Sequence, residues 1–195
     1  MNDMSAWASK IARELLEQPL PRRWAHTQGV ARKARSLAPI LGDDADLLEA
    51  AAWLHDIGYS PQIAVTGFHP LDGARYLRDI VHADDVVCRL VAGHSCAIIE
   101  AEQRGLVEEL SREFPPADEP LRNALTYCDM TTTPDGEHVT VGSRLSEIRD
   151  RYGPGHLVTR FIRLAEPYLV DAVRSVQSHL GPHTTDIFRI GTTHI

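Results

Sequence analysis

Apolar residues recur every three or four positions along most of this chain, which is the spacing of one face of an α-helix. Near the N-terminus, Trp7, Ile11 and Leu15 follow this spacing, and Ser5 stands where a helix N-cap is expected. The alternation typical of a β-strand is confined to the short stretch 138–141. The pattern therefore predicts an all-α protein.

Prolines, glycines and N-capping residues divide the chain into predicted helices. These helices span residues 5–18, 21–41, 43–54, 70–80, 84–93, 98–114, 121–128, 142–152 and 155–180. A kink is expected at Pro167 in the last of them. Residues 59–68 and 131–137 are expected to form loops, because both contain proline and glycine. No internal repeat or interdomain linker is evident, so the helices are expected to form a single domain.

The composition is that of an ordinary globular protein, with 195 residues, 43% of them hydrophobic, and a formal net charge of −7. The acidic balance argues against nucleic-acid binding and against a basic membrane-surface role, because both need a positive field. No apolar run reaches the ~18–20 residues of a membrane span. Three cysteines without a CxxC motif predict neither disulfides nor a thiolate zinc site. A cytoplasmic location is therefore expected.

Several histidine and aspartate side chains fall on apolar helix faces or at helix ends. His26 shares a face with Val30, for example, and His94 shares one with Leu90. One such residue alone is usually structural, but a group of them predicts a metal site between facing helices. A set of imidazoles and carboxylates without sulfur favours Fe, Mn, Zn or Mg. The predicted ligands are His26, His55, Asp56, His69, His94 and Asp129.

The motifs around these residues resemble the H…HD…D signature of the HD-domain metal-dependent phosphohydrolases. They read Arg-Trp-Ala-His26, Trp-Leu-His55-Asp56-Ile-Gly58 and Tyr-Cys-Asp129. His69 and His94 add the two further histidines of the binuclear members. The order H, HD, H, H, D is similar to that of bacterial hydrolases that split diadenosine tetraphosphate symmetrically. It is also the order in cyclic-di-nucleotide phosphodiesterases of the HD class and in HD-fold di-iron oxygenases.

This resemblance implies a single-domain HD-type helical bundle with two divalent metal ions, Fe or Mn before Zn or Mg. His26, His55, Asp56 and Asp129 would bind one ion, and His69 and His94 would bind the other, with Asp56 bridging the two. The expected organisation is a helix in residues 1–20, the HD core in 21–133, further helices in 134–180 packed on that core, and a polar tail in 181–195.

The implied activity is hydrolysis of a phosphoester or phosphoanhydride by metal-activated hydroxide. Asp56 and Asp129 are the predicted catalytic residues, and Arg22, Arg75 and Arg144 are the predicted substrate contacts. The substrate is expected to be a nucleotide or another small phosphorylated metabolite. The chain departs from the patterns of these families at two places. Tyr59 replaces the lysine that usually follows an HDIG motif, and 133–136 replaces a Glu-Pro-x-Arg stretch.

The sequence alone leaves two other functions open. A di-iron oxygenase would have the same ligand order, and a non-catalytic module could use the metal for stability alone. Iron content and O2 consumption would identify the oxygenase, and bound metal without turnover would identify the module. The sequence does not indicate the oligomeric state. The histidines outside the motifs are predicted to lie at the surface, namely His82, His138, His156, His179, His183 and His194.

Overall fold

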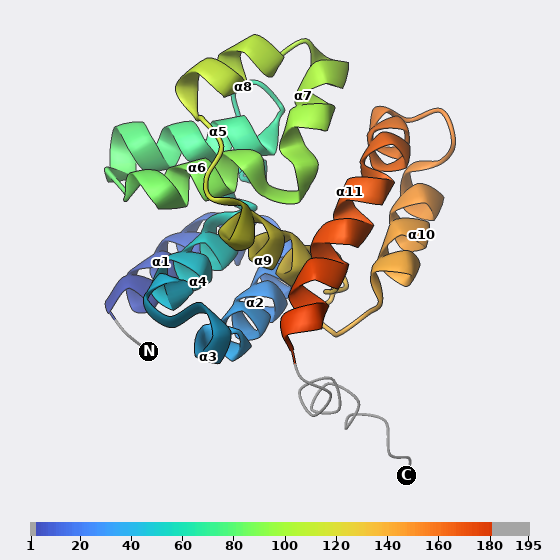
Figure 1. Ribbon diagram of the computed structural model, residues 1–195. Helices are drawn as coiled ribbons and strands as arrows, with labels where there is room; N and C mark the ends of the chain where they lie inside the picture. The colour runs from blue at the N-terminus through green and yellow to red at the C-terminus, as the bar shows by residue number, and fades with distance from the viewer. Residues whose placement is uncertain (1–2, 181–195) are drawn as a thin grey trace.

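The computed structural model describes residues 3–180, and this part of the chain consists of helices joined by loops (Figure 1). Thr132 and His138 form one isolated β-bridge, and no strand forms within this range. The all-α prediction is therefore confirmed. The helices are α1 (Asp3–Leu16), α2 (Pro21–Ser36), α3 (Ala38–Leu41), α4 (Ala45–Leu54), α5 (His69–Tyr76), α6 (Asp85–Gly93), α7 (Ala97–Arg104), α8 (Val107–Glu113), α9 (Glu119–Met130), α10 (Val141–Tyr152) and α11 (Leu157–His179).

Helix α4 lies at the centre of the packing and contacts α1, α2, α6 and α9. Leu48 and Leu54 of α4 are fully buried, as are Val30 of α2 and Leu125 of α9. Burial of such side chains contributes about 1.5–3 kcal/mol each, which makes this contact region the main hydrophobic core. The doublet His55-Asp56 follows the last residue of α4 directly, so the core holds it firmly in place.

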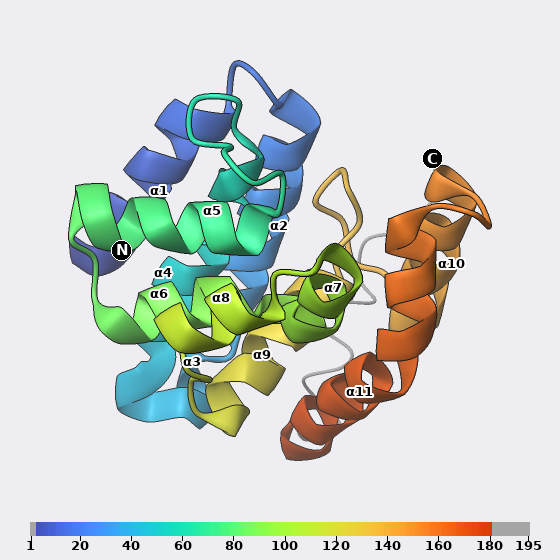
Figure 2. The ribbon, with the colours of Figure 1, turned by 90° about the horizontal axis from the view of Figure 1, so that it is seen from above.

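Helices α10 and α11 pack against each other and stand at one side of the bundle, as Figures 1 and 2 both show. Helix α11 also contacts α9 and α7, and it passes through Pro167 without a break. Helix α11 thereby lies beside residues 94–96, the segment that follows α6. No helix in residues 3–180 combines the length and apolar character that crossing a membrane would require.

Several helix boundaries differ from the predictions. The segment 98–114 forms two helices, because Gly105 adopts a left-handed φ of 71° that ends α7. The segment 21–41 divides into α2 and α3 around Leu37. Ser5 is not an N-cap: it lies inside α1, buried, and donates a hydrogen bond to Glu49 of α4. The predicted tail 181–195, with His183 and His194, lies outside the described residues.

Two close backbone approaches bring the site segments together. A Cβ atom on Gly58 would lie 2.0 Å from the carbonyl oxygen of His69, so only glycine allows the start of α5 to pack against the turn after α4. A Cβ on Gly29 of α2 would lie 2.5 Å from the carbonyl oxygen of Gly136. Gly136 itself has a φ of 85° and packs against Ala25. The loop after α9 therefore lies directly on α2.

Candidate metal centre

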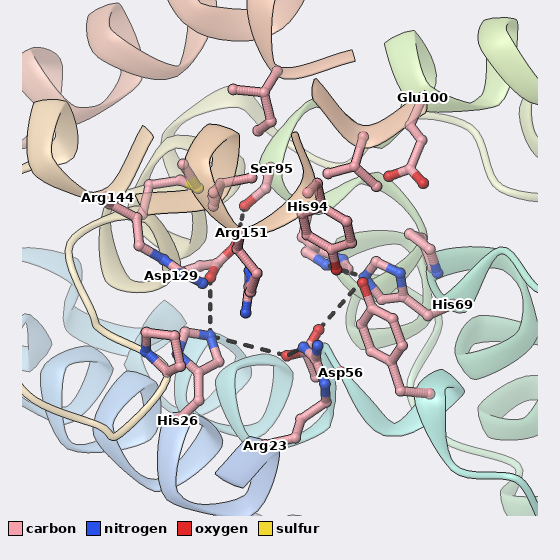
Figure 3. Close-up of a pocket in the computed structure, with 18 of the residues that line it drawn as sticks. Arg23, His26, Asp56, His69, His94, Ser95, Glu100, Asp129, Arg144 and Arg151 are labelled. Atoms are coloured by element: carbon pink, nitrogen blue, oxygen red, sulfur yellow. Dashed lines mark hydrogen bonds and ion pairs between the residues drawn. The ribbon is translucent and has the colours of Figure 1, made fainter. Parts of the chain in front are cut away.

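The six predicted ligands converge from five separate segments of the chain (Figure 3). His26 comes from α2, the doublet His55-Asp56 from the end of α4, and Asp129 from the last turn of α9. His69 is the first residue of α5, and His94 follows the last residue of α6. All are buried except His69, which is partly exposed. Helices distant in sequence thus share one polar interior.

The ligand atoms form two adjacent groups, each able to hold one ion. His26, His55 and Asp129 make the first group, and Asp56, His69 and His94 make the second, with the ligand atoms of each lying within 4.8 Å of one another. In the first group, His26 Nε2 lies 3.0 Å from Asp129 Oδ1. In the second, His69 Nε2 lies 3.1 Å from His94 Nε2 and 3.4 Å from Asp56 Oδ1.

Asp56 is the residue that links the two groups. Its Oδ1 faces His69, while its Oδ2 lies 3.4 Å from His55 Nε2 and 3.9 Å from His26 Nε2. One carboxylate therefore presents an oxygen to each group. This geometry agrees with the bridging position that the family resemblance implies for Asp56.

Backbone carbonyls fix the orientation of three of the imidazoles. His26 Nδ1 lies 2.9 Å from the carbonyl oxygen of Thr133. His55 Nδ1 lies 2.8 Å from that of Ala52, and His94 Nδ1 lies 2.6 Å from that of Val91. A carbonyl can only accept, so each Nδ1 carries a proton, and each Nε2 is the ring nitrogen that faces the other ligands. Metal-binding histidines in proteins are held in this way.

One of these nitrogen atoms is left without a partner. His55 is fully buried, and its Nε2 has no hydrogen-bond partner within residues 3–180. A buried acceptor without a donor is unfavourable, and a cation between the imidazoles and the carboxylates would satisfy it. The donor set, four imidazoles and two carboxylates, therefore fits divalent metal ions.

The electrostatics of the cluster keep two of the imidazoles neutral and both carboxylates ionised. Burial lowers the pKa of His69 and His94, which keeps both imidazoles neutral. Burial would raise the pKa of Asp56, but Arg23 and His55 outweigh it, and the pKa lies well below its ordinary value. The pKa of Asp129 is likewise lowered, because His26 outweighs the effect of burial. Both carboxylates are ionised.

Three neighbours that the sequence did not identify as supports hold these ligands. Arg23 pairs with Asp56, and its guanidinium lies 3.6 Å from the centre of the Tyr59 ring. The other face of Tyr59 stacks on His69, with ring centroids 3.9 Å apart. Ser95 donates a hydrogen bond to Asp129 Oδ2 from a left-handed backbone conformation with φ of 47°. Of these three residues, the sequence analysis had singled out only Tyr59, as a departure from the lysine expected at that position.

A cavity of about 390 Å³ opens onto the cluster. It is lined by ligands from both groups and by apolar side chains of α10 and α11. Its arginines are Arg22, Arg23, Arg144 and Arg151. Arg144 is buried, and its Nε has no hydrogen-bond partner among the described residues, although its Nη1 pairs with Glu147. A buried guanidinium with a free N–H can bind an anion in this cavity.

The three predicted substrate contacts have different positions. Arg144 and Arg22 line the cavity, but Arg22 is exposed and pairs with Asp135 at 2.8 Å. Arg75 does not line it, which corrects the expectation from the sequence. Its guanidinium turns to α8, where it bonds Glu109 at 2.7 Å and Glu113 at 3.0 Å. The sequence could not reveal these partners, because they lie more than thirty residues away.

Among the described residues, the four histidines outside the cluster lie at the surface, as predicted. His82, His138, His156 and His179 are exposed. Cys88, Cys96 and Cys128 are free thiols, and Cys88 and Cys128 are buried. Neither feature adds a ligand to the two groups.

The fold and the cluster together define a class: helical proteins that hold metal ions with histidines and aspartates in the order H, HD, H, H, D. This chain belongs to the HD domain family, whose model matches residues 23–184. The match extends beyond residue 133, where the sequence placed the end of the core, and includes α10 and α11. Neither a curated protein nor a solved structure matches the chain.

Proposed function

We propose that the protein is a metal-dependent phosphohydrolase that cleaves a phosphoester or phosphoanhydride in a small phosphorylated metabolite. The main support is the buried convergence of the six ligands beside a cavity that carries arginines. HD domains bind divalent metals, and Fe or Mn are the first candidates for this donor set. The proposed substrate class includes nucleotides.

Asp56 and Asp129 are the proposed catalytic residues. Divalent ions, when bound, lower the pKa of coordinated water and polarise a phosphoryl oxygen. Asp56 would hold both ions, since it faces both groups. Asp129 would hold one ion through Oδ1 and orient the attacking water, while Ser95 fixes its Oδ2. Both aspartates would therefore act directly on the metal ions, and Asp129 would also act on the attacking water.

Arginines would bind the phosphate oxygens. Arg144 is the first candidate, because its unpartnered Nε is already desolvated beside the cavity. Two divalent ions would add four positive charges to a site with two carboxylates, which leaves a net positive cavity in an acidic protein. A phosphorylated anion suits that potential. Arg22 would assist from the exposed rim.

Metal analysis and a substrate panel test this function. Protein purified without chelator should contain Fe or Mn, and it should hydrolyse at least one member of a panel of nucleotides, diadenosine tetraphosphate, cyclic dinucleotides and simple phosphomonoesters. His55→Ala should lose both metal and activity, while His82→Ala, an exposed histidine outside the cluster, should keep both. O2 consumption without phosphate release would instead identify an oxygenase, and bound metal without any turnover would identify a binding module.

A further inference from the structure

Glu100 is a buried carboxylate in the cavity that the proposed chemistry does not use. It lies on α7, is only 6% exposed, and lines the same cavity as the metal ligands. Figure 3 shows it on the His69 and His94 side of the site, away from Arg144. Arg144 and Glu100 thus line opposite sides of the same cavity.

The pairing of Glu100 leaves one of its oxygens available. Arg104 bonds Oε1 through both Nε, at 2.8 Å, and Nη2, at 2.6 Å. No hydrogen bond from residues 3–180 reaches Oε2. The guanidinium of Arg104 is itself held over the ring of Phe68, with its Cζ 5.5 Å from the ring centre. Arg104 thus anchors one oxygen and leaves the other for a partner in the cavity.

Burial makes such a partner important. Burial raises the pKa of Glu100 above its ordinary value, although Arg104 opposes this effect. The neighbouring walls are largely apolar, since Val158, Phe161 and Ile162 of α11 line the same cavity. Arg104 satisfies one oxygen of this carboxylate, and a donor on a bound molecule would satisfy the other. A surface ion pair within a helix would need neither this burial nor this position.

We infer that Glu100 accepts a hydrogen bond from a hydroxyl or ammonium group at the end of the substrate remote from its phosphate. The inference rests on the proposed function for the phosphate end. The substrate class is then a small phosphomonoester with an apolar middle, which packs on α11, and a distal hydrogen-bond donor. Arg144 and the metal ligands bind one end of this molecule, and Glu100 recognises the other.

Three aromatic phosphomonoesters that differ only at the para position test the inference. They are 4-methylphenyl, 4-(hydroxymethyl)phenyl and 4-(aminomethyl)phenyl phosphate, assayed with the full-length Mn²⁺-loaded protein. The wild type should prefer a donor-bearing substrate to the methyl compound by about tenfold or more in kcat/KM. Preference for the amino compound alone identifies an ammonium ligand, and preference for both donors identifies a hydroxyl-tolerant site. Glu100→Gln should reduce the amino preference at least about tenfold.

A binding measurement separates this inference from the proposed function. The matching benzylphosphonates cannot be hydrolysed, so their Kd values, measured by calorimetry, report recognition alone. Glu102→Gln, an exposed residue on the same helix, should leave the preference unchanged, and the Tm and Mn²⁺ content of each variant check its fold. Equal Kd values for the three phosphonates, no phosphonate binding, or a preference retained in Glu100→Gln would overturn the inference. Selective phosphonate binding without any phosphate hydrolysis would overturn the proposed function alone.

Discussion

Two clusters of polar side chains in this protein differ in whether they are complete. The first is the metal centre. The second, which we call the Glu49 network, joins Ser5 of α1, Arg35 of α2 and Glu49 of α4. In the Glu49 network one carboxylate meets one guanidinium and one hydroxyl, and Arg35 Nε lies 3.1 Å from Glu49 Oε1. Its charges and hydrogen bonds balance within the chain.

The metal centre has a surplus of acceptors instead. Two ionised carboxylates lie among imidazoles of fixed orientation, and His55 Nε2 has no hydrogen-bond partner in the described part of the chain. Arg23 and Ser95 supply donors to the two carboxylates, but not to the imidazoles. A polar cluster whose groups pair with one another needs no ligand, whereas one with an unpartnered buried nitrogen beside two carboxylates is suited to bind cations.

Removing a ligand should produce the largest difference between the two clusters. His55→Ala should weaken metal binding by more than about 100-fold, because even residues that only orient ligands contribute 10- to 100-fold. Wild-type protein at a metal concentration 100 times Kd should gain about 2.7 kcal/mol in unfolding free energy, and the variant should not. Calorimetric titration and thermal unfolding measure both effects. Glu49→Gln is the control, and a loss of metal affinity in that variant would contradict the comparison.

Gly58→Ala should disturb the second ligand group through packing. The new Cβ would meet the carbonyl of His69 at 2.0 Å, so the start of α5 must move. We expect a loss of about 1–3 kcal/mol in unfolding free energy, as for other overpacked sites. Binding of one of the two ions should also weaken more than binding of the other. Gly142→Ala has open space around its Cβ and is the control. Unchanged binding of both ions would show that α5 adjusts without moving His69.

Ser95→Ala should give a smaller effect on the first ligand group. The change removes the hydrogen bond to Asp129 Oδ2 and leaves the carboxylate free to rotate. Metal affinity should fall about tenfold, at the lower end of the range for residues that orient ligands. Calorimetric titration compares this variant with Ser111→Ala, an exposed serine on α8. Equal affinities in the two variants would mean that Asp129 is oriented by His26 alone.

The smallest expected effect is the pH response of the Glu49 network. Burial would raise the pKa of Glu49, but hydrogen bonds from Arg35 and Ser5 lower it below its ordinary value. A lowered pKa in the folded state gives stability that is present above the pKa of the unfolded chain, about 4.3, and is lost as the pH falls through the folded value. Relative to Glu49→Gln, the wild type should gain about 1 kcal/mol at pH 7. Denaturant unfolding measures the difference, which should shrink in acid; a constant difference from pH 3 to 7 would contradict it.

Much of the fold and the ligand set could be predicted from the sequence because both leave periodic signals. Apolar spacing identified the helices, and His26, His55 and His94 stood out because they interrupt apolar faces. The helix break at Gly105 was missed, since a left-handed glycine and a tolerated mid-helix glycine look the same in sequence. Arg75 was misplaced because its acidic partners on α8 are set by helix packing, not by spacing along the chain.

The sequence by itself therefore determined the helical class, the HD motifs and the six candidate ligands, because each depends on residues that are close along the chain. Only the tertiary structure decided how these ligands divide into two groups and which arginines face the cavity. It also decided that Ser95, Tyr59 and Glu100 lie beside the same centre. The physical reason is that such contacts join segments whose approach depends on core packing and on close backbone contacts such as that of Gly58 with His69.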